Sequence, residues 1–398
     1  MTSASAGRAD LDDRDTAVIN AFQGGFPIVE HPYEPAAEAL HERGIEMSAG
    51  ELFERVCELD EEGVLSRFGA LIDAEAIGGT ATLVALHAPE ERFEEIADTV
   101  NGFHEVAHNY EREHPHLNMW FVLSVAADED VEDVLARIED ATGQKTYNLP
   151  KQQEFRVEAK FPVDGPLREE SVDLSHLGPA PERTDRDSLT PAERDLILEI
   201  QGGLPMTETP YADVAEALGA DTDAVLRTLR RFNAEGKVRR VGLVPNHYAL
   251  GYSENGMTVW NVPDELVEDV GKAVSAMDFV THCYERPRHE GVWPYNFFAM
   301  THGRDEAESE ARIEQVRETM AEFFDVEEAD WDTLFSTRIL KKTGIRLDER
   351  AASNTDERAG GAENADADTD AEAGSEEKAD GGTDADGAEK KEASEATE

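Results

Sequence analysis

The sequence is poor in cysteine, since Cys57 and Cys283 are the two thiols among 398 residues. Two cysteines so far apart exclude a disulfide framework and a cysteine metal cluster. Long apolar runs are missing too: no stretch approaches the roughly 18 apolar residues of a membrane helix, and the N-terminal segment lacks the apolar core of a signal peptide. We therefore expect a soluble cytoplasmic protein that does not associate with membranes.

Basic residues are also scarce, with 37 Lys and Arg against 88 Asp and Glu, and the formal net charge is -51. Because 39% of the residues are hydrophobic and periodic apolar segments recur, we expect a folded core under an acid-coated surface. Such surfaces are typical of halophilic proteins, whose solvent screens charge repulsion over a few ångströms. Residues 351–398 contain no Val, Ile, Leu or aromatic residue, so we predict a disordered acidic tail there.

The rest of the chain repeats itself. The segment "QGGFPIVEHPY" at 23–33 returns as "QGGLPMTETPY" at 201–211, each after a short apolar helix. A further helical stretch and a Gly followed by two short alternating strands come next in both copies. This order predicts two winged helix-turn-helix domains, at 10–75 and 190–248.

A second block repeats in the same order. Alternating strands ("TATLVALHAP", "ENGMTVWNVP") end at a Pro that opens an amphipathic helix, and a His-x-Tyr-Glu-Arg strand, another strand, a helix and a last strand follow. The order βαββαβ predicts ferredoxin-like domains at 78–161 and 252–347. A Pro-rich, charged segment at 162–189 is predicted as the linker between the two halves. The predicted fold class is α+β, as a tandem repeat.

A winged helix joined to a βαββαβ domain resembles the Lrp/AsnC regulators. The segments "GGLPMTETPY", "VRRVGLVPNHYALGY", "VTHCYERP", "WPYNFFAMTHGR" and "LFSTRILKK" are similar to one branch of these proteins, the siroheme decarboxylases. The resemblance covers roughly residues 15–161 and 190–347 and is strongest in the second half.

This resemblance implies an enzyme of the alternative heme pathway that removes acetate carboxyls from siroheme, with no cofactor beyond the iron of its substrate. It also implies two related subunits fused in tandem as an internal pseudo-dimer, with further self-association left open. The first half lacks the Pro after "HNYER" and has "HPHLN" in place of "WPYN", so we expect the main site in the second half. An Lrp/AsnC-type transcription regulator and a tetrapyrrole-binding sensor remain as alternatives.

The charges of the two heads bear on the regulator alternative. The second helix of the first head is acidic, whereas its counterpart "TDAVLRTLRRFNAEGKVRR" is basic. Two equivalent heads usually contact two half-sites, so this asymmetry argues against DNA binding. The basic cluster is either a solvated helix face or a carboxylate-binding group, in which case Arg239 and Arg240 are its preferred members.

The strand "THCYER" carries the candidate catalytic residues. Alternation places His282, Tyr284 and Arg286 on one face, with Cys283 and Glu285 on the other. Decarboxylation of a pyrrole acetate requires a positioned carboxylate and a delivered proton. We predict His282 as general acid, Tyr284 as orienting or relay group and Arg286 as carboxylate ligand; a purely structural role for the three is the alternative.

The remaining candidates would bind substrate. An aromatic wall for a flat ring is predicted from Trp293, Tyr295 and Asn296. Axial ligands for the substrate iron are sought among His247, His282 and His302. Arg338 and Lys342 on the last strand are either edge cations or carboxylate ligands, and His108, Tyr110 and Arg112 could assist from the first half. No metal site of the protein itself is predicted, because HExxH and paired-Cys spacings are missing.

Overall fold

The computed structural model describes residues 9–125, 129–158, 160–163, 171, 172, 174, 177–179 and 189–342. The predicted linker is therefore described only in part, and the predicted tail at 351–398 lies outside the described residues. Among the described residues no helix is both long and apolar enough to cross a bilayer.

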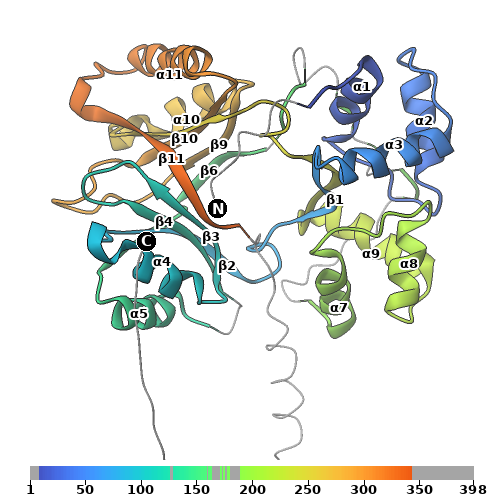
Figure 1. Ribbon diagram of the computed structural model, residues 1–398, viewed down its shortest axis with the longest axis horizontal. Coiled ribbons are helices and arrows are strands. Elements are labelled where there is room, and N and C mark those ends of the chain that lie inside the picture. Colours follow the sequence, from blue (N-terminus) through green and yellow to red (C-terminus); the bar gives the residue numbers. More distant parts are fainter. Residues whose placement is uncertain are drawn as a thin grey trace, which may run out of the picture. The chain divides into compact units, whose positions relative to one another are not determined.

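Each head consists of three helices and one strand (Figure 1). Capping boxes start the helices where the sequence offers them: Ser48 pairs with Glu51, and Thr190 pairs with Glu193 ahead of Pro191. The elements of the two heads are α1 (Asp13–Phe22), α2 (Tyr33–His41), α3 (Ala49–Glu61) and β1 (Leu65–Ile72), and α7 (Pro191–Ile200), α8 (Pro210–Ala217), α9 (Thr222–Glu235) and β7 (Val238–Pro245).

The wing strands pair between the heads, which corrects the predicted two-stranded wing in each head. Strand β1 runs antiparallel to β7 with Gly69 opposite Gly242. A side chain at Gly242 would come within 2.7 Å of the Phe22 carbonyl oxygen, so only glycine allows this close backbone approach. Apolar residues of both heads form one continuous core, and the heads are a single structural unit.

The predicted βαββαβ order is present in both halves. The first comprises β2 (Thr80–Leu86), η1 (Glu90–Arg92), α4 (Phe93–Asn101), β3 (Val106–Arg112), β4 (Met119–Val125), α5 (Val131–Thr142), β5 (Thr146–Pro150) and β6 (Gln153–Val157). The second comprises β8 (Glu254–Trp260), η2 (Asp264–Leu266), α10 (Val267–Ser275), β9 (Val280–Glu285), β10 (Phe297–Gly303), α11 (Glu306–Ala321), η3 (Glu328–Asp330) and β11 (Trp331–Lys342).

The halves exchange the ends of their last strands. Strand β11 pairs with β8 of its own half through Trp331–Phe335 and with β3 of the first half through Ser336–Lys342. Strand β6 likewise leaves its own half and pairs with β9. The resulting order of nine strands is β5-β2-β4-β3-β11-β8-β10-β9-β6. The first half therefore supplies the strand beside the predicted catalytic strand.

Helices cover the outer faces of the sheet, with α10 and α11 over the second half and α4 and α5 over the first (Figure 1). Each helix layer has its own apolar core. A third core lies on the inner face and brings Trp120 and Leu149 of the first half together with Trp293, Phe298 and Leu334 of the second. Apolar side chains therefore fill part of the inner face, and the polar part of that face is the candidate place for a ligand.

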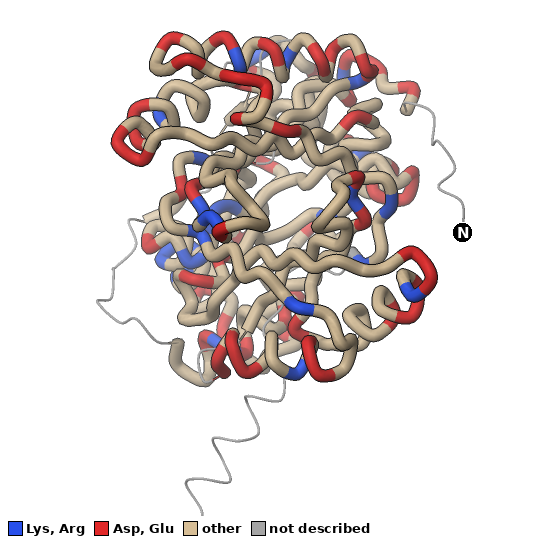
Figure 2. The backbone as a smooth tube through the Cα atoms, turned by 90° about the vertical axis from the view of Figure 1, so that its left-hand side faces the viewer, with Lys and Arg blue, Asp and Glu red and all other residues tan. Residues whose placement is uncertain are grey.

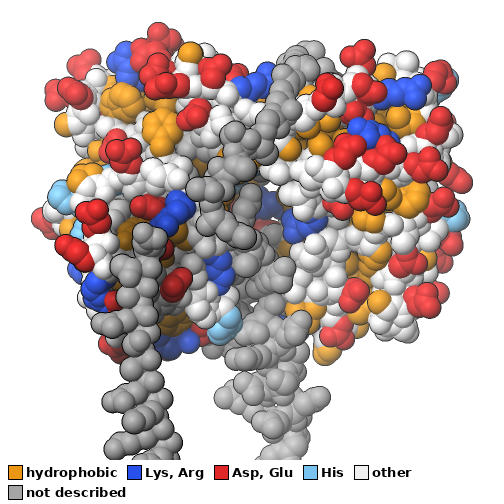
Figure 3. Space-filling model, viewed as in Figure 1, with side chains coloured by type: hydrophobic (Ala, Val, Ile, Leu, Met, Phe, Trp, Pro, Cys, Tyr) orange, Lys and Arg blue, Asp and Glu red, His pale blue; other side chains and the backbone are white. Residues whose placement is uncertain are grey.

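Acidic residues follow the outer helices and loops, with fewer Lys and Arg among them (Figure 2). On the face shown in Figure 3 the acidic side chains are spread over the surface of both the sheet-and-helix part and the heads. Basic side chains that are gathered and buried inside such a protein consequently mark unusual positions.

Candidate active site

The face of β9 that carries the site is the inner one. Cys283 belongs to the core under α10 and α11, and His282 and Tyr284 point to the opposite face with their ring centroids 6.1 Å apart. The guanidinium carbon of Arg286 lies 4.8 Å from the centre of the Tyr284 ring. Alternation along the strand therefore brings the three predicted catalytic residues together, as expected.

Arg286 is a largely buried cation without a carboxylate partner among the described residues. Its Nη1 donates a hydrogen bond to the Leu149 carbonyl of β5, while its Nε–H has no hydrogen-bond partner in that part of the chain. Burial lowers the pKa of Arg286 to about 10, so the side chain stays charged at neutral pH. A buried charge with an unused donor is costly unless an anion arrives to pair with it.

His282 is neutral in this environment. Burial lowers its pKa to about 4, and the nearby arginines Arg239, Arg286 and Arg240 lower it further against an opposing effect of Glu154. Its Nδ1 shares a hydrogen bond of 2.9 Å with the Thr281 hydroxyl. The predicted role as general acid therefore requires a change of surroundings that returns a proton to His282.

His302 does not offer a nitrogen to a ligand. Its Nε2 lies 2.8 Å from the Thr281 hydroxyl oxygen and its Nδ1 lies 2.5 Å from Asn255 Oδ1, so both ring nitrogens are occupied. The ring is 6% exposed, and burial lowers its pKa well below the usual value. The structure therefore argues against the predicted roles of His302 in substrate binding and iron ligation.

A network of ion pairs lies beside His282 and Tyr284. Arg239 of β7 pairs with Asp73 at 2.6 Å and with Glu154 of β6 at 2.9 Å. Lys151 pairs with Glu154 at 2.5 Å and with Glu75 at 2.9 Å. Burial raises the pKa of Glu154, but hydrogen bonds from Arg239 and Lys151 outweigh this and lower it overall. The acids that pair with Arg239 and Lys151 all come from the first half or its head.

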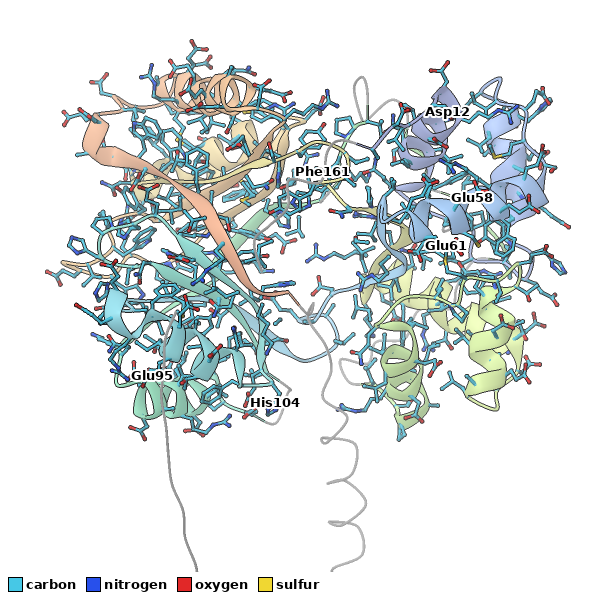
Figure 4. All side chains as sticks on the ribbon, viewed as in Figure 1. Asp12, Glu58, Glu61, Glu95, His104 and Phe161 are labelled. Carbon is cyan, nitrogen blue, oxygen red and sulfur yellow. The ribbon has the colours of Figure 1, made fainter. Side chains whose placement is uncertain are left out.

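Arg240 and His247 lie at the same junction. Arg240 is 7% exposed, and its charge acts on His282 and on Glu158. His247 stacks on Phe161 with ring centroids 5.1 Å apart, and Phe161 lies between the sheets and the heads in Figure 4. Phe161 also contacts the His302 ring edge-on at 4.8 Å. The structure thus gathers Arg239, Arg240 and His247 near His282.

The predicted aromatic wall is wrong in its geometry. Trp293 has no exposed surface and packs against Trp120 at 4.9 Å and His114 at 5.4 Å. Asn296 is 2% exposed and holds the backbone of Val262, accepting from its N–H at 2.9 Å and donating to its carbonyl at 3.1 Å. Tyr295 contacts Trp293 edge-on at 5.0 Å. Trp293 and Asn296 therefore fix the loop before β10 and present no free face to a ring, whereas Tyr295 is half-buried.

Arg338 is paired with acidic residues of the protein itself, which argues against its predicted alternative role as a carboxylate ligand. It pairs with Glu94 at 2.7 Å and Glu111 at 2.9 Å and covers the Phe93 ring, all on the helix side of the sheet. Lys341 donates to backbone carbonyls at the end of α4, on the same side. Simple alternation would place Arg338 and Lys341 on opposite faces, and register shifts in the pairing of β11 with β3 break this alternation. Lys342 pairs with His108 along the backbone.

The first half retains a related group on β3. His108 and Tyr110 have ring centroids 6.3 Å apart, and Arg112 lies over the Tyr110 ring and donates to the Leu334 carbonyl at 2.7 Å. The neighbouring strands differ between the two groups. On the strand beside Tyr110 the paired residue is Ile339, whereas on the strand beside Tyr284 it is Glu154. In the wing strands, Ser66 lies three residues before Gly69, as Arg239 lies three residues before Gly242, so Ser66 is the counterpart of Arg239. The group on β3 therefore has no counterpart of the Arg239–Glu154 ion pair at these positions.

Three basic residues of the second head are engaged in contacts within the protein, whereas Arg227 on α9 is exposed. Arg230 donates to the Ile28 carbonyl of the first head at 2.8 Å. Arg231 pairs with Glu193, and Lys237 pairs with Glu235 at 2.7 Å. These contacts disfavour a phosphate-binding surface on α9.

One group of potential metal ligands occurs among the described residues, formed by His104, Glu105 and Glu129. Arg137 lies 2.5 Å from a carboxylate oxygen of each glutamate and compensates their charge. His104, labelled in Figure 4, lies at the start of β3, away from Phe161 and the junction with the heads.

Known proteins share this architecture and these segments. An AsnC-like ligand binding domain matches residues 76–156 and 249–341, and a siroheme decarboxylase NirDL-like HTH domain matches residues 15–65 and 193–239. The siroheme decarboxylase NirDL subunit of Paracoccus pantotrophus is 32% identical over 342 residues, which cover 86% of this chain and 99% of that protein. The chain belongs to the siroheme decarboxylase family.

Two further members extend the likeness. The siroheme decarboxylase NirH subunit of Paracoccus pantotrophus is 50% identical over 155 residues, covering 39% of this chain and 94% of its own. A crystal structure of the siroheme decarboxylase NirDL with an iron-uroporphyrin III analogue matches with a TM-score of 0.61 and 27% identity, covering 87% of this chain and 99% of the other. The siroheme decarboxylase fold thus extends over both halves of the chain.

Sequence reasoning missed several members of the site. Asp73, Glu75, Lys151 and Glu154 are ordinary charged residues in a very acidic sequence. Lys151 and Glu154 approach β9 because β6 crosses into the second half, and Asp73 and Glu75 follow β1, which pairs with β7. Strand alternation places Thr281 on the opposite face from its neighbour His282, so the pattern does not predict a contact between them. In the structure the Thr281 hydroxyl nevertheless hydrogen-bonds to both His282 and His302. A register shift between β9 and β10 beside Thr281 makes this contact possible.

Proposed function

We propose that this chain is a carboxy-lyase that removes acetate carboxyl groups from siroheme as CO2 and yields didecarboxysiroheme for heme biosynthesis. The observation that carries the proposal is Arg286, whose guanidinium has a buried Nε–H without a hydrogen-bond partner and no carboxylate partner in the described chain, and which lies beside Tyr284 and His282. A substrate carboxylate would complete this arrangement, because a guanidinium pairs with carboxylates through parallel hydrogen bonds. Family membership supports the choice of siroheme.

The residues around Arg286 suit the chemistry of the step. When CO2 leaves the acetate, its bonding electron pair remains on the methylene carbon, where the pyrrole ring delocalises it, and one proton then completes a methyl group. Arg286 would hold the substrate by a carboxylate, and His282 would deliver the proton after substrate carboxylates raise its pKa from about 4. Burial keeps Tyr284 protonated by raising its pKa, so it would act as a hydrogen-bond donor.

The network around Arg239 suggests how further carboxylates would bind. Glu154 and Asp73 pair with the guanidinium of Arg239, and Glu154 and Glu75 pair with Lys151. Substrate carboxylates would replace these acidic side chains as the ion-pair partners of Arg239 and Lys151. Each cation keeps its compensation throughout, which limits the cost of leaving charge unpaired in a partly buried place.

The first half serves in this proposal as the partner that completes the second-half site. It supplies β6 with Glu154 and the segment with Asp73 and Glu75, as a related subunit would do in a heterodimer. His108, Tyr110 and Arg112 form a second, less complete constellation. A transcription regulator is disfavoured because Arg230, Arg231 and Lys237 are bound internally.

The test is an anaerobic incubation of the purified chain with siroheme at high salt, followed by mass spectrometry. Loss of CO2 from the tetrapyrrole supports the enzyme, and Arg286→Ala should abolish it. An unchanged tetrapyrrole with a shifted absorption spectrum would instead identify a sensor. Salt-dependent binding to a specific DNA duplex without turnover would identify a regulator.

A further inference from the structure

Four side chains form a continuous line of hydrogen bonds that ends at His282. Asn255 Oδ1 lies 2.5 Å from His302 Nδ1, His302 Nε2 lies 2.8 Å from Thr281 Oγ1, and Thr281 Oγ1 lies 2.9 Å from His282 Nδ1. Three of these residues are buried, with Asn255 7%, His302 6% and Thr281 3% exposed. Buried polar chains of this kind hold their members in one arrangement.

The direction of the line follows from the amide of Asn255. Its Nδ2 donates to the Ser253 carbonyl at 3.3 Å, which turns Oδ1 toward His302. Oδ1 can only accept, so the proton of His302 is on Nδ1. His302 is neutral because burial lowers its pKa well below the usual value, and its Nε2 therefore carries a lone pair.

The remaining protons are then fixed as well. The Thr281 hydroxyl donates to His302 Nε2, so its oxygen accepts from His282 Nδ1–H. In neutral imidazole only one nitrogen carries a proton. His282 Nε2 is consequently left with its lone pair, and no residue of the described chain bonds to that nitrogen.

We infer that Asn255, His302 and Thr281 are positioning residues that hold His282 as the Nδ1–H tautomer and keep its Nε2 free to act on the substrate. An imidazole nitrogen with an available lone pair can accept a proton or approach the iron of a bound tetrapyrrole. The buried His302 thus acts through His282 and does not touch the substrate. The link to turnover rests on the proposed function, whereas the tautomer is a property of the free protein.

The first half provides an internal comparison, because its His108 has no such line of residues. Strand pairing gives the counterparts: Ala107 for Thr281, Ser124 for His302 and Ala81 for Asn255. Alanine has no polar side-chain atom, so the line cannot form there. The Tyr and Arg of the motif occur in both halves, whereas the hydrogen-bonded residues that orient the histidine, Asn255, His302 and Thr281, have counterparts of the same type at none of the corresponding positions of the first half. A histidine tautomer fixed by this line of hydrogen bonds therefore belongs to the second half alone.

The experiment observes the His282 ring directly. Long-range ¹H–¹⁵N spectra of protein with ¹⁵N-labelled histidine distinguish the two neutral tautomers, and His282→Gln identifies the signal. The wild type should show His282 protonated at Nδ1. Thr281→Val, which keeps the shape and removes the hydroxyl, should shift His282 to the other tautomer or to a mixture. Thr281→Ser should restore the wild-type spectrum, and Thr82→Val on β2 serves as the matched control.

Turnover gives the second readout. Loss of the hydrogen bond that orients a metal-ligating histidine lowers activity by about 10- to 100-fold. By analogy, kcat for siroheme should fall by about that factor in Thr281→Val and recover in Thr281→Ser. A wild-type signal with the proton on Nε2, or a Thr281→Val signal identical to wild type, would overturn the inference. If Thr281→Val shifts the His282 tautomer but the wild-type protein does not decarboxylate siroheme, the inferred role of Thr281 stands and the proposed function is rejected.

Discussion

His282 should make the protein less stable in mild acid, by an amount that its pKa defines. The pKa is about 4 in the folded protein, because of burial first and of neighbouring arginines as well, and about 6.5 in an unfolded chain. Between these values the unfolded chain binds more protons, so the free energy of unfolding falls as pH decreases through this window. Linkage across that shift gives a loss of about 2 kcal/mol between about pH 7.5 and about pH 5.

Urea denaturation followed by circular dichroism at constant salt measures this loss. Other groups also titrate in the window, so the informative quantity is the difference between wild type and His282→Gln. The variant should lose about 2 kcal/mol less than wild type over the same pH change. His87→Gln, which removes an exposed histidine, should behave as wild type. Parallel pH profiles for wild type and His282→Gln would show that His282 is not held neutral and refute the reasoning.

Three further substitutions separate the corrected roles from the predicted ones. Trp293→Ala should lower the free energy of unfolding by about 3–5 kcal/mol in urea denaturation, because the indole is fully buried; a loss of siroheme affinity at unchanged stability would restore the predicted wall. Arg338→Ala should change stability by less than about 1 kcal/mol and leave decarboxylation intact, since its ion pairs are exposed. Glu154→Gln should lower the Kd for siroheme about tenfold in a spectral titration by removing an internal competitor, whereas Glu285→Gln should not; a weaker Glu154→Gln complex would show that Glu154 holds the substrate site together.

Local periodicity accounts for what could be predicted of the site. Residues two apart on a strand share a face whatever the strand packs against, so the spacing of His282, Tyr284 and Arg286 was enough to group them. The same rule failed for Arg338 and Lys341, because register shifts in β11 change the alternation and depend on its pairing with another half of the chain.

Long-range packing accounts for what could not be predicted. Trp293 follows the catalytic strand closely in sequence and suggests a ligand wall, but an indole is largely apolar and finds its place against Trp120 of the other half. His302 is of a residue type that commonly ligates iron, but both of its ring nitrogens are hydrogen-bonded, one to Thr281 and the other to Asn255. In each case the partner lies far away in the sequence.

The sequence by itself determined the tandem repeat, the βαββαβ order in each copy, and the face on which the candidate catalytic residues of β9 lie, because these follow from patterns within short segments. Tertiary structure alone decided that β6 crosses to β9, that Glu154 meets Arg239, and that Asn255, His302 and Thr281 orient His282. Apart from the contact between the neighbours Thr281 and His282, those contacts join segments separated by tens of residues, and no local preference specifies which acid or polar side chain will be the partner. The second-half site is therefore encoded in its own strand but assembled by both halves.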